Sequence, residues 1–132
     1  MERFLKIEKG MTISTVEGVL GFKLTIEKQR EEHFQADMAH LEDRGVWLFF
    51  TPETQELYTI RYEAPFPLAI EGVRIGDTKK MVKELRGKPL RVDPFPYPHS
   101  ETIWIYGKSK DPDWVRFDFE KKRNGKCITI FR

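Results

Sequence analysis

The residues best suited to acid-base or metal chemistry are three histidines and one cysteine. His33, His40 and His99 stand in dissimilar surroundings. On a helix the first two would lie about 10 Å apart along the axis, which is too far for them to share a metal ion unaided. Cys127 lies in the strand-like stretch KCITIF, where a cysteine behaves as a small packed side chain. We therefore expect no metal site and no cofactor.

Signatures of common enzyme classes are also missing from the sequence. The chain has no G-x-S-x-G nucleophile elbow, no phosphate-binding glycine loop and no C-x-x-C pair. An enzyme would have to gather His33 or His99 with carboxylates from distant segments. We therefore expect a protein without enzymatic activity.

Three aromatic stretches offer the residue types that dominate protein-binding hot spots. They are VWLFF (46–50), TIWIYG (102–107) and WVRFDF (114–119). Successive strand residues point to opposite faces, so an aliphatic face would pack on helices and an aromatic face would bind a protein partner. The alternatives are that a loop, the segment 27–43 or a second copy of the chain covers this face. The residues predicted on it are Trp47, Phe49, Trp104, Tyr106, Trp114 and Arg116.

A proline-rich stretch, RVDPFPYPHSE (91–101), carries further aromatic residues. Its prolines prevent continuous pairing in a sheet, so a loop is expected. Phe95 and Tyr97, together with His99, form a second candidate for partner binding, because prolines lower the entropy lost on docking. The alternative is a lid packed over the neighbouring helix.

Lysines and arginines provide a third surface chemistry. One basic cluster lies on the helix and exit at 78–91, and another lies at 121–126. Such clusters are typical of polyanion binding, but the net charge is only +2 and no nucleic-acid motif is present. Binding of nucleic acid or another polyanion is therefore an alternative that ranks below a protein partner. The helix residues that would carry it are Lys79, Lys80, Lys83 and Arg86.

The helix that must position these charges is predicted by GVRIGDTKKMVKELRGKP (72–89). Asp77 or Thr78 can cap its first turn, and Gly87 followed by Pro89 ends it. The basic residues take the outer face. The apolar residues predicted to share the inner face are Met81, Val82 and Leu85.

The remaining sequence reads as strands and turns, in an order that repeats. GVWLFFTPETQELYTIRYE lines up with DWVRFDFEKKRNGKCITIFR, and the pair Asn124-Gly125 is a strong turn signal. The alignment predicts one domain, 1–132, built from two related halves, 1–64 and 65–132. STVEGVL (14–20) would be the counterpart of the later helix.

One segment, 33–42, fits two secondary structures. Phe34, Met38 and Leu41 give a helical stripe, whereas Phe34, Ala36 and Met38 alternate as in a strand. The repeat favours a strand, because the corresponding TIWIYG precedes an aromatic strand.

From the N-terminal stretch and the cysteine count we expect a cytoplasmic protein rather than a membrane protein. The N-terminal stretch MERFLKIEKGM has no apolar run long enough for a signal peptide or a membrane span. The single cysteine excludes an internal disulfide and fits a reducing compartment. Residues 1–64 carry 8 basic against 12 acidic side chains, and residues 65–132 carry 15 against 9. This asymmetry could steer a partner.

The segment 70–132 resembles the helix-then-sheet repeat of the β-lactamase-inhibitor-protein-like and outer-membrane lipoprotein (SmpA/OmlA) superfamily, with a weaker echo in 14–62. The motif is Gly-x-Thr, apolar Val and Leu, then Gly-x-Pro, and Arg86 replaces the leucine of the family before the second glycine. The matching positions are Gly76, Thr78, Val82, Leu85, Gly87 and Pro89.

The resemblance implies an α+β fold in which a short helix packs on an antiparallel β-sheet, twice in tandem. Members of the superfamily include enzyme inhibitors, envelope lipoproteins and small cytoplasmic proteins, some of the bacterial toxin-immunity type. Since no lipid-attachment cysteine follows the N-terminus, we expect a cytoplasmic inhibitor, most concretely an immunity protein that neutralises a toxin or enzyme domain.

Overall fold

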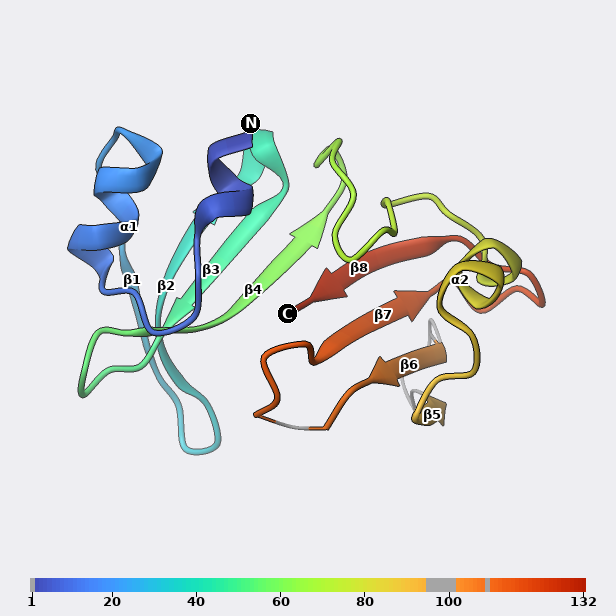
Figure 1. Cartoon of the computed structure of the whole chain (residues 1–132). Helices are drawn as coiled ribbons and strands as arrows, with labels where there is room; N and C mark the ends of the chain where they lie inside the picture. Colours follow the sequence, from blue (N-terminus) through green and yellow to red (C-terminus); the bar gives the residue numbers. More distant parts are fainter. Residues whose placement is uncertain (1, 95–101, 109) are drawn as a thin grey trace. The chain divides into compact units, whose positions relative to one another are not determined.

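The computed structural model describes residues 2–94, 102–108 and 110–132 (Figure 1). The chain divides into two compact units, Met1–Ile60 and Arg61–Arg132.

The first unit contains a helix followed by an antiparallel set of strands. A short 3₁₀ helix (Glu2–Lys6) precedes α1 (Ile13–Leu20). Thr12 caps α1 by accepting a hydrogen bond from the Thr15 amide, and Gly21 ends it in the left-handed region. The strands are β1 (Glu27–Arg30), β2 (Gln35–Leu41), β3 (Val46–Phe50) and β4 (Leu57–Glu63), the last of which continues into the second unit. The segment 33–42 is thus largely a strand, and a helix also forms at 14–20, as predicted.

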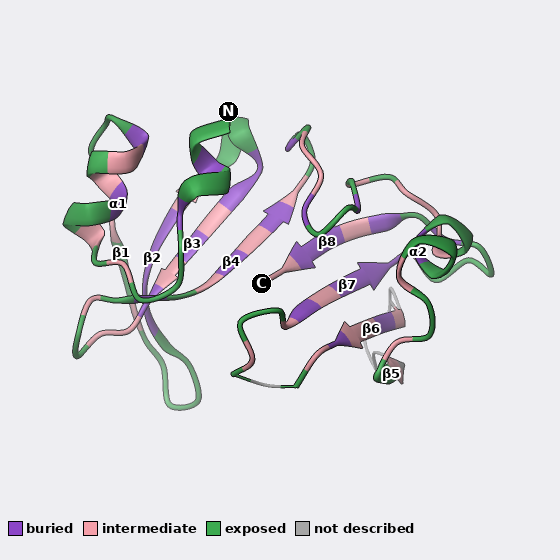
Figure 2. Ribbon diagram, viewed as in Figure 1, coloured by how far each residue is buried: buried purple, intermediate pink, exposed green. Residues whose placement is uncertain are grey.

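The core of the first unit lies on one side of its strands. Val46, Leu48 and Phe50 are fully buried, whereas the intervening Trp47 and Phe49 are half-buried, which gives β3 its alternating colours in Figure 2. This is the alternation expected of a strand with one covered face. The buried residues contributed by the 3₁₀ helix, α1 and the intervening chain are Phe4, Ile7, Val16 and Leu20.

The second unit begins with the end of β4 and contains α2 (Lys79–Arg86), β5 (Arg91–Pro94), β6 (Thr102–Tyr106), β7 (Val115–Phe119) and β8 (Cys127–Phe131). Thr78 is the N-cap of α2 and accepts from the Met81 amide at 3.3 Å. Asn124 Oδ1 accepts from the Lys80 amide at 3.1 Å, so the turn between β7 and β8 also caps this helix. Gly125 is required there, because a Cβ would clash with the backbone carbonyl of Glu120.

The inner face of α2 differs from the predicted one. Val82 is 1% exposed, but Met81 is 51% and Leu85 is 59% exposed. The residues turned inward are Lys79, Val82 and Arg86, spaced i, i+3 and i+7, and the Arg86 guanidinium lies 4.8 Å from the centroid of a β6 ring. The aliphatic stems of Lys and Arg can cover apolar surface while their charges reach polar partners. The predicted helical spacing is therefore correct. The side chains that face inward, however, are Lys79, Val82 and Arg86 instead of Met81, Val82 and Leu85.

Hydrogen-bonded strands follow the order β1-β2-β3-β4-β8-β7-β6-β5. The paired strands are antiparallel, which confirms the predicted α+β class with an antiparallel sheet. Within the described part of the chain, no helix is long and apolar enough to cross a membrane.

Candidate functional site

Five rings form a continuous surface on the open face of the first unit. We call it the aromatic stripe, and it consists of Phe34, His40, Trp47, Phe49 and Tyr58. The His40 and Trp47 rings stack with centroids 3.5 Å apart and planes 11° apart. Phe49 follows Trp47 at 6.2 Å, and it meets Phe34 and Tyr58 at 6.3 Å each. The predicted neighbours Trp47 and Phe49 therefore lie at the centre of this stripe.

The stripe keeps contact with solvent. Phe34 is 40% and Tyr58 is 38% exposed, and the other three rings are half-buried. Burial still raises the pKa of the Tyr58 hydroxyl above its ordinary value. Among the described residues, His40 Nε2 has no hydrogen-bond partner although it is buried. A ligand on this face would therefore meet mainly aromatic surface.

Strand register explains why these rings meet. Trp47 pairs with His40, and Phe49 pairs with Met38. Residues directly opposite in an antiparallel ladder share a face and interact. Gly45, with φ 69°, closes the connection that sets this register after a 3₁₀ turn (Glu42–Arg44). The sequence alternation identified Trp47 and Phe49, but only the register adds His40 from β2.

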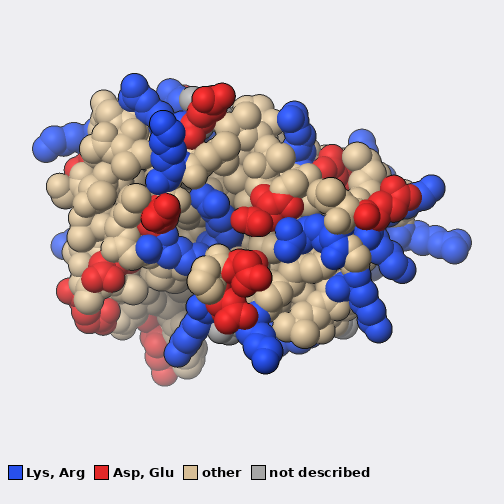
Figure 3. Space-filling view, in the orientation of Figure 1, with Lys and Arg blue, Asp and Glu red and all other residues tan. Residues whose placement is uncertain are grey.

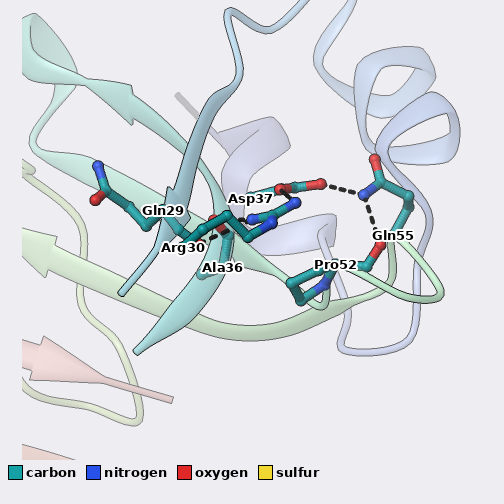
Figure 4. A network of polar contacts seen from close by, with 6 residues as sticks. All are labelled: Gln29, Arg30, Ala36, Asp37, Pro52 and Gln55. Carbon is teal, nitrogen blue, oxygen red and sulfur yellow. Dashed lines mark hydrogen bonds and ion pairs between the residues drawn. The ribbon is translucent and has the colours of Figure 1, made fainter. Parts of the chain in front are cut away.

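A buried carboxylate fixes the strands that carry the stripe. Asp37 on β2 is 1% exposed, and Arg30 Nη2 on β1 donates to its Oδ1 at 2.7 Å (Figure 4). Gln55 Nε2 donates to the other oxygen and to the Pro52 carbonyl. Arg30 also donates to the Ala36 carbonyl at 3.2 Å. The network joins β1, β2 and the turn after β3.

Two opposing effects act on the pKa of the Asp37 carboxyl. Burial raises it, but hydrogen bonds from Gln55 and Arg30 and the charges of Arg30 and Lys28 lower it. The lowering prevails, so Asp37 is held as an anion. Asp37 therefore positions the β1–β2 hairpin. The N–H groups of Arg30 and Gln55 that donate to it are directed at the carboxylate rather than at solvent.

The aromatic residues of β6 lie on the helix-covered face of the second unit. Trp104 pairs with Phe117 and Tyr106 pairs with Val115, so they share a face with core residues. Tyr106 is 6% exposed, and its hydroxyl donates to the Gly87 carbonyl at 2.8 Å. Burial raises the pKa of this hydroxyl, and the nearby Arg86 charge partly offsets the effect.

Arg116 lies on the opposite face from Trp104 and Tyr106. It pairs with Ile105, whose side chain points away from Trp104 and Tyr106. Trp114 precedes β7 and has the same parity as Arg116. The prediction of one face shared by Trp104, Tyr106, Trp114 and Arg116 is therefore wrong. The register of the β6–β7 hairpin decides which residues of the two strands lie on the same face of the sheet. A register shifted by one residue would place Arg116 on the same face as Trp104 and Tyr106.

The two basic clusters of the sequence come together in the second unit. Lys79 Nζ lies 3.4 Å from the Lys122 carbonyl and donates to the Thr102 hydroxyl at 3.3 Å. Burial lowers the pKa of Lys79. Lys80, Lys83 and Lys121 are exposed, and Lys and Arg gather over α2 and the adjacent turn at the right of Figure 3. Arg86 is turned inward and is not part of this exposed cluster.

The other residues considered for catalysis or metal binding lie in different elements of the fold. Cys127 is buried in β8, as predicted, and burial raises the pKa of its thiol far above the ordinary value. His33 is exposed in the turn between β1 and β2. No group of three or more His, Cys, Asp or Glu could hold a metal ion among the residues that the structure describes. Phe95, Tyr97 and His99 lie outside the described residues.

Comparisons with known proteins found a distant structural likeness. No family model matches the chain, and no curated protein matches it. The chain is similar to the crystal structure of a DUF4309 family protein, YjgB, from Bacillus subtilis subsp. subtilis str. 168. The identity is 18%, the match covers 91% of this chain and 76% of that chain, and the TM-score is 0.48. A similarity at this level carries no information on family or function.

Proposed function

We propose that the chain is a non-enzymatic protein that binds a protein partner through the aromatic stripe. The observation that carries this proposal is a continuous row of rings on a sheet face, of which Phe34 and Tyr58 are the most exposed. Aromatic side chains supply most of the energy at protein interfaces, because each buries a large area with few rotatable bonds. A face of this kind is costly to leave in water.

The most concrete form of this function is a cytoplasmic bacterial immunity protein or inhibitor, whose partner is a toxin or enzyme domain. Its support is the resemblance of the segment 70–132 to the superfamily motif, although the motif residue Leu85 is 59% exposed rather than packed inward. Thr78 caps α2, Val82 is buried beneath it, and Gly76 and Gly87 have positive φ angles. We also infer a tandem duplication, because a helix followed by four strands occurs in each half of the chain.

The test compares two tryptophan-to-alanine substitutions in otherwise identical proteins. Trp47→Ala removes the centre of the stripe, and Trp114→Ala removes the same side chain from the second unit. The wild type is used to isolate a partner from nuclease-treated lysate of the source organism, and the purified partner is then titrated by calorimetry. Trp47→Ala should weaken binding about 30-fold, the effect of a hot-spot residue worth about 2 kcal/mol.

Circular dichroism must first show that both variants fold. Trp114→Ala should change the affinity less than threefold. A partner that binds Trp47→Ala as tightly as the wild type would overturn the role of the stripe. Toxicity of the partner, relieved by co-expression of this chain, would support the immunity function specifically.

A second candidate function is binding of a polyanion through α2. It is favoured by the hydrogen bonds that dock the first turn of α2 on the β7–β8 turn, since they bring two basic segments together. Lys80 and Lys83 are the exposed helix residues that would contact phosphates or sulfates. This function ranks second because Lys79 and Arg86 are committed to contacts within the fold.

A further inference from the structure

The strand β1 directs both of its cations to the side of the sheet that faces away from the aromatic stripe. Lys28 pairs with Asp37, and Arg30 donates to the Asp37 carboxylate. Asp37 in turn pairs with Phe50, which belongs to the buried core. Since residues directly opposite one another share a face, Lys28 and Arg30 lie on the core side. Figure 4 shows Arg30 directed to Asp37 and the neighbouring Gln29 directed away from it.

Two carboxylates of the same hairpin lie on the side of the stripe. Glu27 of β1 pairs with Met38, and Met38 pairs with Phe49 of the stripe. In the turn after β1, the Glu31 amide donates to the Phe34 carbonyl at 3.0 Å, and the Phe34 amide donates to the Glu31 carbonyl at 3.4 Å. Glu31 is therefore directly opposite Phe34, another ring of the stripe. Glu27 and Glu31 thus border the stripe along β1.

Glu27 and Glu31 present their carboxylates to solvent. Both side chains are exposed. Among the described residues, neither of them forms an ion pair with a lysine or an arginine. The surrounding unit is acidic as well, since residues 1–60 contain 7 Lys and Arg against 11 Asp and Glu. The border of the stripe therefore favours a ligand with positive charge.

The rings of the stripe also attract cations. An aromatic ring is negative on its faces, so a guanidinium group stacks on it favourably. Elsewhere in the chain, arginines lie over the rings of Phe4, Tyr62, Tyr106, Phe117 and Phe131. In the part of the chain that the structure describes, no arginine lies over Phe34 or Tyr58, the two most exposed rings of the stripe. A cation from a partner can therefore reach both rings.

We propose that the occupant of the aromatic stripe is an extended, arginine-bearing segment of the partner protein, an inference that rests on the protein-binding function proposed above. Its arginine side chains lie on the rings, and their guanidinium groups donate to the carboxylates of Glu27 and Glu31. Because successive residues of an extended chain point to opposite sides, arginines at every second position all face the stripe.

The combination of rings and carboxylates selects arginine over lysine. The guanidinium group is planar, so it can stack on a ring and donate two parallel N–H bonds to a carboxylate. The lysine ammonium is a compact, strongly hydrated charge without this fork. A second copy of the chain would offer mainly lysine, since the exposed basic cluster at α2 and the adjacent turn includes Lys80, Lys83 and Lys121.

The first experiment titrates the ¹⁵N-labelled full chain at low salt with three blocked pentapeptides and follows the backbone amides by NMR. The arginine peptide is acetyl-Arg-Ala-Arg-Ala-Arg-amide. A citrulline peptide has the same shape without the charge, and a lysine peptide has the same charge without the fork. We expect the arginine peptide to bind with a Kd of about 1 mM or tighter, with shifts centred on β1, β2 and β3. The citrulline peptide should bind about tenfold more weakly, and the lysine peptide about threefold more weakly.

Matched variants test the carboxylates and the rings separately. Glu27→Gln combined with Glu31→Gln should weaken binding of the arginine peptide about fivefold, the effect of two exposed charges. Phe34→Leu keeps an apolar side chain but removes a ring, and it should weaken binding about threefold. The control is Glu2→Gln combined with Glu8→Gln, which removes the same charge from the N-terminal segment of the same unit and should leave the affinity unchanged. Amide shifts that stay unchanged away from the substituted residues show that each variant folds.

The proposal fails if the arginine peptide shows no saturable binding, if the citrulline peptide binds equally well, or if the control weakens binding as much as the paired Gln variant of β1 and its turn. Self-association of the wild type that Trp47→Ala abolishes would assign the stripe to a second copy and overturn the proposal. The protein-binding function has its own readout. If the arginine peptide fails but the natural partner still loses affinity for Trp47→Ala, that function stands and only the arginine chemistry is wrong.

Discussion

At the scale of single residues, Asp37 shows how a buried charge can be structural. Asp37→Asn removes the anion but keeps the shape, and one amide N–H must then face the donors of Arg30 or Gln55. We expect a loss of about 1–3 kcal/mol in the free energy of unfolding at neutral pH. The lower part of that range is expected, because the Arg30 side chain is 41% exposed and can turn to water. Urea unfolding followed by circular dichroism measures the loss.

The same residue should give the protein an acid-sensitive component of stability. The fold lowers the pKa of Asp37 below its ordinary value of 3.8. Its contribution is therefore complete above that value and is lost as the pH falls through the lowered folded-state pKa. The difference in unfolding free energy between the wild type and Asp37→Asn should shrink on acidification below about pH 4. A difference that stays constant over that range would contradict this assignment.

At the scale of elements, α2 offers a direct comparison between expected and observed packing. Val82→Ala removes two buried methyl groups and should cost about 2 kcal/mol of unfolding free energy. Leu85→Ala removes more atoms, but the side chain is 59% exposed, so the cost should stay within about 0.5 kcal/mol. Urea unfolding of the two variants and the wild type decides the point. A larger loss for Leu85→Ala would restore the inner face that the periodicity predicted.

Local patterns predicted much of each element, because they depend on neighbours in the sequence. Spacing predicted a cap at Asp77 or Thr78, the end of α2 before Gly87 and the alternation of Trp47 with Leu48. What the sequence did not contain is the register between strands. Trp104 and Arg116 were correctly assigned to faces of their own strands, but the matching of those faces depends on the hairpin geometry.

The same limit explains which site residues were missed. Phe34 and His40 reach the aromatic stripe from the turn before β2 and from β2 itself, and Tyr58 reaches it from β4. Pairing Trp47 with His40 would have found the stack, but it requires knowing that the β2–β3 connection is a short 3₁₀ turn. The ion pairs Arg61–Glu63, Arg91–Asp93 and Arg116–Asp118 each follow an i, i+2 pattern in the sequence, but only strand register places them on one face of the sheet.

At the scale of the whole molecule, charge is divided unevenly along the chain. Residues 1–60 contain 7 Lys and Arg against 11 Asp and Glu, and residues 61–132 contain 16 against 10. If the polyanion function holds, affinity for heparin should fall steeply with salt, because bound counterions are released on association. Replacing Lys80 and Lys83 by Gln should reduce the slope of log K against log salt by about 2.

The control for this measurement is Lys23→Gln with Lys28→Gln, which removes the same charge from residues 1–60. That control should leave the slope unchanged. Equal slopes for the wild type and the α2 variant would contradict polyanion binding by the helix. The aromatic stripe would then remain as the recognition surface to test.

The burial of Cys127 in β8 has a practical consequence for studies of this chain. A thiol reacts with most reagents only as the thiolate, and this thiol is 1% exposed, with its pKa raised by burial and by the charges of Asp118 and Asp77. Modification therefore has to wait until β8 separates from its neighbours. Because this is the only cysteine in the sequence, the rate at which a thiol reagent modifies Cys127 reports how often residues 61–132 open. No engineered label is needed.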